Sequence, residues 1–293
     1  MKKKLWLYGY GLAACISLPL SQQAYADDWS GYADVSVIAG GYSGTTTRTA
    51  INAYGASLNL NYLEWGGMKV AGSQLTITDR GNAIKQEAVF ASIYANHFCD
   101  TLSGVFKFRL DVHQASLSDD FTYQDKVVAY APQISFLNYQ KSFYADLGYA
   151  VSTYDLGFEV KQYTPTLGFG FNQGADWMQV RGYWVDATHQ RTTNVQSTQA
   201  VELKLTHWTE PGSMFSQYFV NALAGERIFA VDGDAAAIYS LVDKQQGGGA
   251  IGVAWQSQYV DGMVMLSVDQ YLNQATNATY INSLVYISMS KSW

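Results

Sequence analysis

The sequence predicts an all-β protein folded as a single antiparallel up-and-down β-barrel that spans a membrane. Three observations predict this fold. Apolar and polar side chains alternate along most of the chain, the connections alternate between short turns and longer polar loops, and most tryptophans fall at one end of the strands. We expect about 14 strands, with about 12 or 16 as alternatives, and no plug domain.

Alternation with a period of two is the first of these observations. The stretch VFKFRLDVHQ (105–114) places apolar side chains on one face of a strand and Lys107, Arg109, Asp111 and His113 on the other. The stretch VELKLTH (201–207) repeats the pattern with Glu202 on the polar face. Side chains point to opposite faces at successive positions of a strand, so both stretches predict strands with one apolar and one charged face.

The connections distinguish a barrel from a soluble sandwich, whose strands also alternate. One set is short and turn-like: EWGGM, FCDTLSG, NYQKSF, NQGAD, TEPGSM and YVDGM. The other set is longer and polar: GTTTRTA, TDRGNAIK, SDDFTYQD, YDLGFEVK, ATHQRTTNVQ and NQATNA. Short turns on one rim and long loops on the other are typical of a transmembrane barrel. The candidate strands lie near 32–43, 50–65, 68–80, 86–98, 105–118, 126–139, 143–154, 160–172, 177–188, 197–208, 214–230, 246–259, 263–273 and 280–293.

The tryptophans give an independent check, because the amphipathic indole ring favours a membrane–water interface. Two of them, Trp184 and Trp255, fall within the candidate strands. The others after the N-terminal segment fall at strand ends on the short-turn rim: Trp29, Trp65, Trp177, Trp208 and Trp293. We interpret these five as a periplasmic aromatic girdle.

Residues 1–26 predict a cleaved secretory signal peptide, which leaves residues 27–293 as one barrel domain. Three lysines precede a short apolar stretch that ends in Ala-Tyr-Ala at Ala26. The alternative is a lipoprotein signal at Leu-Ala-Ala-Cys, cut before Cys15. Loss of three lysines leaves 15 of the 18 basic residues against 24 acidic ones, a net charge of −9. Such a charge excludes nucleic acid as a partner, and Cys99, the only cysteine that remains, excludes an internal disulfide.

The C-terminal stretch INSLVYISMSKSW (281–293) alternates apolar and polar residues and ends on an aromatic one. In this it resembles the last strand of Gram-negative outer-membrane β-barrel proteins, whether porin-like or similar to the YaiO and exopolysaccharide-export barrels. The resemblance implies an outer-membrane location, contact with outer-membrane lipid and lipopolysaccharide, and recognition by the barrel-assembly machinery. The implied assembly signal is Val285, Ile287, Met289 and Trp293; Lys291 departs from the apolar series.

The longest predicted connection, residues 225–249, has an apolar centre. We expect its two flanking strands to extend past the membrane as a hairpin that turns at Asp232-Gly233-Asp234. One alternative folds this segment into the lumen as a constriction. A second alternative lets part of it cross the membrane, which would give a barrel of about 16 strands.

The sequence predicts no enzyme, no cofactor and no metal site. The histidines lie in no motif of the phospholipase or deacylase barrels: His97, His113, His189 and His207. Asp111 and His113 share a strand face as a dyad would, but we expect them to be part of a solvated lumen wall. The Asp232-Gly233-Asp234 stretch lacks further calcium ligands, so we expect a turn. The stretch GFGFNQG (168–174) is expected to be a strand with Gly168 and Gly170 facing the lumen.

The polar strand faces predict a lumen wall that carries both signs of charge. Its predicted residues are Lys107, Arg109, Asp111, His113, Gln179, Arg181, Glu202 and Lys204. A barrel of about 14 strands is wide enough to hold water. We therefore expect a monomeric porin-like channel for small hydrophilic solutes. The alternatives are a barrel that works with a periplasmic partner in export, for example of polysaccharide, and, less favoured, a lipid-modifying enzyme.

Overall fold

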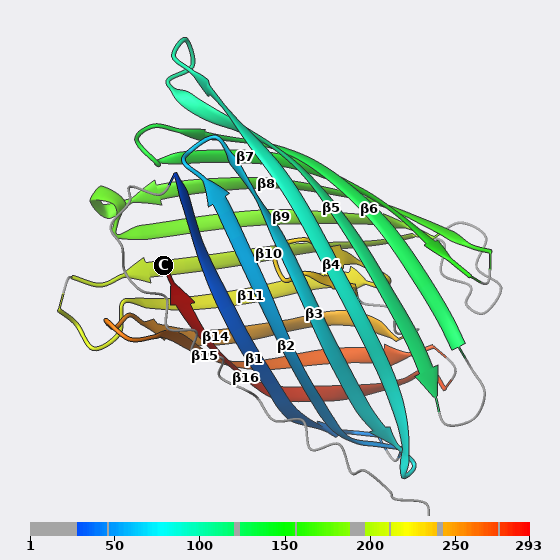
Figure 1. Ribbon diagram of the computed structural model, residues 1–293. Helices are drawn as coiled ribbons and strands as arrows, with labels where there is room; N and C mark the ends of the chain where they lie inside the picture. Colours follow the sequence, from blue (N-terminus) through cyan, green and yellow to red (C-terminus); the bar gives the residue numbers. More distant parts are fainter. Residues whose placement is uncertain are drawn as a thin grey trace, which may run out of the picture.

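The structure is a computed structural model that describes residues 28–45, 47–119, 124–155, 157–187, 197–210, 212–238, 243–274 and 276–293. Its long strands form one closed antiparallel barrel (Figure 1). Each strand pairs with its neighbour in the sequence, except that β11 pairs with β14, and β16 closes the ring on β1. The ring holds 14 strands, so the predicted fold and strand number are confirmed and the counts of 12 and 16 are excluded.

The strand bounds agree with the predicted ranges to within a few residues. The barrel strands are β1 (Trp29–Ser43), β2 (Arg48–Tyr62), β3 (Gly66–Asp79), β4 (Asn82–Cys99), β5 (Gly104–Asp119), β6 (Gln124–Asn138), β7 (Phe143–Tyr154), β8 (Glu159–Phe171), β9 (Asp176–Asp186), β10 (Ser197–Trp208), β11 (Gln217–Arg227), β14 (Lys244–Trp255), β15 (Asp261–Asn273) and β16 (Ala278–Ser292). A 3-10 turn, η1 (Asn172–Gly174), joins β8 to β9. No helix among the described residues is long and apolar enough to cross a membrane.

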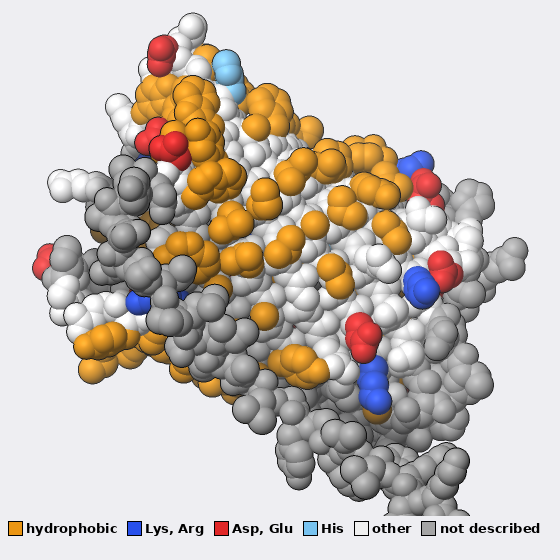
Figure 2. Space-filling view, viewed as in Figure 1, with side chains coloured by type: hydrophobic (Ala, Val, Ile, Leu, Met, Phe, Trp, Pro, Cys, Tyr) orange, Lys and Arg blue, Asp and Glu red, His pale blue; other side chains and the backbone are white. Residues whose placement is uncertain are grey.

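The two faces of the strands differ as the alternation predicts. On β5, Phe108 on the outer face is 50% exposed, whereas Asp111, three residues later on the inner face, is 1% exposed. Figure 2 shows hydrophobic side chains spread over the visible outer wall and charged side chains gathered toward the two ends. An apolar outer surface of this extent is unfavourable in water and suits a hydrocarbon environment.

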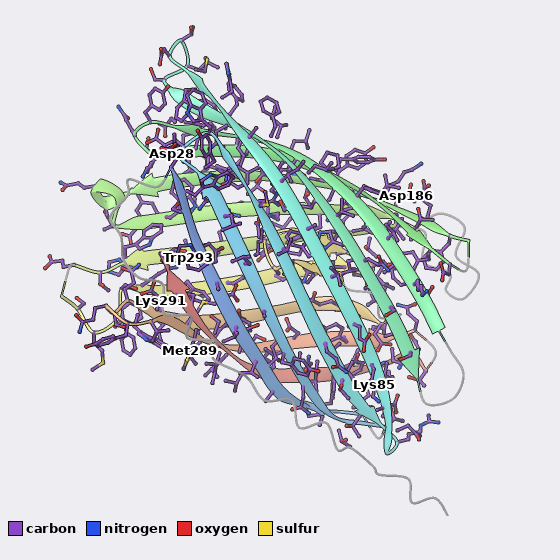
Figure 3. The ribbon with its side chains drawn as sticks, in the orientation of Figure 1. Asp28, Lys85, Asp186, Met289, Lys291 and Trp293 are labelled. Carbon is purple, nitrogen blue, oxygen red and sulfur yellow. The ribbon has the colours of Figure 1, made fainter. Side chains whose placement is uncertain are left out.

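The last strand completes the ring. β16 pairs with β1 from Tyr32↔Ser292 to Ser43↔Ile281, so neither strand is left with an open edge. Figure 3 shows Met289, Lys291 and Trp293 at the same end of the barrel as Asp28, with Lys85 and Asp186 at the opposite end. We call these ends the short-turn rim and the long-loop rim.

The five tryptophans of the predicted girdle lie at the short-turn rim but not on a single face of it. Trp29 and Trp293 are about half exposed, at 51% and 52%. Trp177 pairs with Gly170 and follows the inner series of β9; its ring lies where a side chain at Gly168 would be. A girdle position facing lipid is therefore wrong for Trp177. Trp255 falls within a strand as predicted, but as the last residue of β14 it too lies at this rim.

The segment after β11 folds into the lumen. It forms a small two-stranded sheet of β12 (Val231–Asp232) and β13 (Ala237–Ile238) that is separate from the barrel ring. Backbone N–H groups of Asp234 and Ala235 donate to the Asp232 carboxylate at 3.0 and 3.1 Å, so the predicted turn is confirmed. The predicted extension past the membrane is wrong. We call residues 228–238 the inner hairpin.

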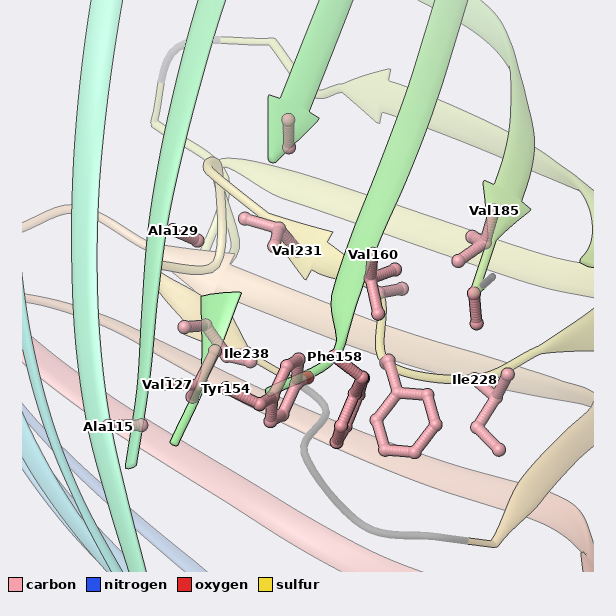
Figure 4. Close-up of a cluster of buried hydrophobic side chains, with 14 residues drawn as sticks. Ala115, Val127, Ala129, Tyr154, Phe158, Val160, Val185, Ile228, Val231 and Ile238 are labelled. Atoms are coloured by element: carbon pink, nitrogen blue, oxygen red, sulfur yellow. The ribbon is translucent and has the colours of Figure 1, made fainter. Parts of the chain in front are cut away.

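Burial of apolar side chains explains why the inner hairpin lies inside. Phe229 packs edge-on against Tyr154 and Phe158, with ring centroids 5.5 and 5.6 Å away, and those two rings stack at 4.1 Å. Figure 4 shows Tyr154 and Phe158 side by side within the cluster of buried apolar side chains. The full cluster is Ala115, Val127, Ala129, Ala150, Tyr154, Phe158, Val160, Val185, Ala187, Ile228, Phe229, Ala230, Val231 and Ile238. Removing this apolar surface from water favours the inward position over a solvated loop.

Candidate functional site

The tip of the inner hairpin is held against the barrel wall by charged groups. The Asp234 carboxylate accepts from Arg109 of β5 at 3.0 Å and from Arg181 of β9 at 2.5 Å. Arg181 also donates to the Thr166 hydroxyl at 3.1 Å and lies 3.9 Å from Asp232. The enclosed lumen opposes ionisation of Asp234, but Arg181 and Arg109 outweigh that effect and hold its pKa below the usual value. Charge-assisted contacts of this kind are stronger than hydrogen bonds between neutral groups.

Gly233 lets the tip reach the wall. A Cβ atom at this position would lie 2.2 Å from the Asp111 carboxylate and 2.6 Å from the Arg109 guanidinium. Asp111 is 1% exposed and its carboxylate lies 3.1 Å from the Nε atom of Arg109, so it has little room to move. Glycine is thus required here for close approach of the backbone to the wall.

Backbone groups of the hairpin are bound by wall side chains as well. The Gln162 side chain on β8 accepts from Val231 N–H at 2.9 Å and donates to its carbonyl at 2.7 Å. Gln86 on β4 donates to the Ile238 carbonyl at 3.3 Å. The hairpin is therefore fixed to both β4 and β8, which belong to different parts of the ring.

Both ends of the segment are anchored near the long-loop rim. Arg227 of β11 donates twice to the Gln245 side chain of β14, at 3.0 and 2.8 Å. Asp243 pairs with Arg48 of β2 and accepts from the Tyr280 hydroxyl at 2.8 Å. Such anchors at the ends and the tip hold the inner hairpin in one position across the lumen.

A cavity of about 760 Å³ remains beside the inner hairpin. Small side chains line much of its outer wall on β2, β3 and β14, which is why this half of the lumen stays open. Its residues include Ala53, Gly55, Ala71, Ser73, Gly248, Gly249 and Ala250. Aromatic, thioether and charged side chains supply the rest of the wall, so the cavity is neither wholly polar nor wholly apolar.

Seven of the eight residues predicted for the lumen wall fall into three groups. Arg109 and Asp111 contact the hairpin tip, as does Arg181, which also reaches the open cavity. Gln179, Glu202 and Lys204 line the open cavity. Lys107 lies on β5 with its ammonium 4.3 Å from the Tyr94 ring centroid.

His113, the last of the predicted wall residues, is 2% exposed and packs edge-on against Phe90 at 4.7 Å. The expectation that Asp111 and His113 are solvated is wrong, because the structure buries both. Their burial leaves no access for a substrate. Within the described ranges, no three His, Cys, Asp or Glu side chains gather as a metal site requires.

The hairpin residues that complete this site are not predictable from any local sequence pattern. Asp234 lies 125 positions from Arg109 and 53 from Arg181, so no local motif joins them. The available signal was the apolar content on both sides of the Asp232-Gly233-Asp234 turn, which a solvated hairpin would expose to water.

Comparison with known proteins supports the fold. No family model matches the sequence, and no curated protein does. Among solved structures, a deletion mutant of the monoaromatic hydrocarbon channel TodX is similar, with a TM-score of 0.57 and 11% identity over 96% of this chain and 94% of that one. A bacterial polysaccharide outer-membrane secretin gives a TM-score of 0.49 and 11% identity, covering 90% of this chain and 98% of that chain. OccK5 (OpdH) of Pseudomonas aeruginosa gives 0.40 and 10%, covering 91% and 98%.

This chain is a β-barrel of the outer-membrane type. The closed 14-strand ring, the apolar outer face and the similarity to TodX along nearly the whole of both chains agree on this point. The low identity limits the likeness to the fold, since one fold supports many functions. The function of this barrel therefore depends on the side chains of its lumen.

Proposed function

We propose that the barrel is a passive channel of the Gram-negative outer membrane for small hydrophilic solutes, with a lumen narrowed by the inner hairpin. The observation that carries the proposal is the hairpin itself, which is held across the lumen by Asp234 between Arg109 and Arg181 and leaves a cavity of about 760 Å³ beside it. A lumen wall that carries charged side chains suits polar and ionic solutes.

The fold comparison supports passage of small molecules rather than catalysis. TodX, which shares the architecture, is a channel. The predicted dyad, Asp111 and His113, is 1% and 2% exposed, so these two side chains are closed to a substrate. Polar solutes are proposed because the lumen wall is charged. They are not inferred from TodX, which is a channel for monoaromatic hydrocarbons.

Single-channel recording in planar bilayers tests the proposal. Purified, folded protein should give defined conductance steps in potassium chloride. The Asp234→Asn variant should shift the reversal potential toward anion preference, because Arg109 and Arg181 then lose their common counter-charge at the narrowest part of the lumen. The matched control is Asp186→Asn, a carboxylate at the long-loop rim on the outer face. Folded wild-type protein that never conducts would overturn the proposal.

A further inference from the structure

The open cavity contains two ammonium groups that form no ion pair with the described part of the chain. Lys69 on β3 and Lys204 on β10 both line it. Going round the ring from β3 to β10, six strands intervene on each side: β4 to β9 on one, and β2, β1, β16, β15, β14 and β11 on the other. The two lysines therefore extend from opposite walls of the lumen.

The carboxylates of the same cavity all have protein partners. Glu202 accepts from Tyr183 at 2.6 Å and from Asn221 at 2.5 Å, and Asp269 accepts from Gln245 at 2.9 Å. The remaining contacts are Asp34 with Ser57, Asp232 and Asp234 with Arg181, Asp234 with Arg109, and Asp243 with Arg48 and Tyr280. The acceptor atoms of these acidic side chains are thus engaged with the wall or the hairpin.

The arginines that reach the cavity are engaged as well. Arg181 binds Thr166 and the hairpin carboxylates, and Arg227 binds Gln245 and lies 4.9 Å from the Tyr183 ring centroid. Lys69 and Lys204 differ from them. Within the part of the chain that the structure describes, neither lysine has a carboxylate within ion-pair distance. Each ammonium has an aromatic ring as a partner, Phe90 at 5.7 Å for Lys69 and Phe219 at 5.6 Å for Lys204. Lys69 acts on Asp111 only at longer range.

An ammonium carries three N–H donors and no acceptor, so these two groups offer hydrogen bonds only to acceptors, and most strongly to anions. Each lysine has an aromatic ring nearby, Phe90 or Phe219, and the thioethers Met263 and Met265 of β15 add apolar surface elsewhere on the wall of the same cavity. A ligand that satisfies both surfaces carries a negative group on a flat apolar body.

We infer that Lys69 and Lys204 form an anion-selecting site in the open half of the lumen, for small organic anions with a flat apolar body. This inference rests on the proposed channel function and narrows its solutes to one class. The anionic group takes the ammonium donors, while the apolar body lies against the aromatic rings and methionines. Because the two lysines lie on opposite walls, an anion that crosses the lumen leaves the ammonium group of one lysine and then binds that of the other.

The test uses permanently charged probes in planar bilayers. Benzenesulfonate should interrupt the potassium chloride current of the wild type at lower concentration than methanesulfonate, which lacks the ring, and benzyltrimethylammonium should not interrupt it. In the double variant Lys69→Gln plus Lys204→Gln, the half-blocking concentration of benzenesulfonate should rise roughly tenfold, the loss expected for a charge-assisted hydrogen bond.

Two control variants separate charge from folding. Lys291→Gln removes a lysine from the outer face and should leave the block unchanged, and Lys69→Arg plus Lys204→Arg should retain most of it. The inference is overturned if the double glutamine variant, folded and conducting, is blocked by benzenesulfonate as the wild type is, or if methanesulfonate blocks equally well. Wild-type protein without conductance would instead refute the channel function.

Discussion

At the scale of single residues, Gly233 decides whether the inner hairpin can touch the wall. We predict that Gly233→Ala displaces the tip, because the added methyl group would meet Asp111 and Arg109 at 2.2 and 2.6 Å. The cost of such overpacking is about 1–3 kcal/mol. Single-channel recording should show larger or more variable conductance steps than in the wild type.

Gly72 provides the matched control for this substitution. It lies on the outer face of β3, and a Cβ atom there would have the Ala88 carbonyl oxygen at 3.9 Å as its nearest neighbour. Gly72→Ala should therefore conduct as the wild type does. Equal conductance of Gly233→Ala and the wild type would show that the tip does not limit the flow of ions.

At the scale of the element, the position of a residue along the last strand should determine how much a charge on the outer wall destabilises the barrel. Val285 lies mid-strand on the outer face of β16, paired with Ala39 and Leu266. Lys291 lies near the short-turn rim, where its amine donates to the Gln258 carbonyl at 3.2 Å. Charge on the lipid face costs about 2–4 kcal/mol at the bilayer midplane and about 0–1 kcal/mol near the interface.

We therefore predict that Val285→Lys lowers the free energy of unfolding by about 2–4 kcal/mol, whereas Lys291→Leu changes it by no more than about 1 kcal/mol. Urea titration of barrels folded into lipid vesicles measures both values. Similar losses for the two variants would mean that the outer face of β16 does not lie in hydrocarbon. Lys291 thus departs from the apolar series at the position where departure costs least.

Among the elements, the barrel strands were predictable from the sequence, whereas the position of the inner hairpin was not. Strands such as β5 and β10 were predictable, because alternation with a period of two is a local pattern that each strand carries by itself. The placement of the inner hairpin was not, because it depends on which apolar surface the folded barrel offers. Val127, Tyr154, Phe158 and Val185 provide that surface only once β6 to β9 are aligned. Apolar content alone fits an extended strand equally well.

The candidate site, too, was predictable only in part. The wall residues Arg109, Arg181 and Lys204 were predictable from strand parity. Their states of pairing were not, since Asp234 approaches from a distant segment and Lys204 has a ring, not a carboxylate, as its neighbour. Parity assigns a side chain to a face but says nothing of what fills the space in front of it, and that is also why Asp111 and His113 were expected to be solvated.

At the scale of the whole molecule, the ring and the inner hairpin are separable. Arg227 and Gln245 are partners in the ladder between β11 and β14, so the two strands already meet where the hairpin leaves the wall. All barrel strands pair with both neighbours without any contribution from β12 or β13. Closure of the barrel thus does not depend on the segment that narrows it.

We predict that replacing residues 229–242 with a short turn containing Asn-Gly leaves a closed barrel, because such turns join adjacent antiparallel strands directly. Heat-dependent mobility on gels should show that the variant still folds. Its single-channel conductance should be several-fold above that of the wild type, because the hairpin no longer fills part of the lumen. Its anion preference should be stronger, because Arg109 and Arg181 lose the counter-charge of Asp234. A folded variant with wild-type conductance would place the narrowest part of the channel elsewhere, and a variant that cannot fold would show that barrel closure needs the hairpin.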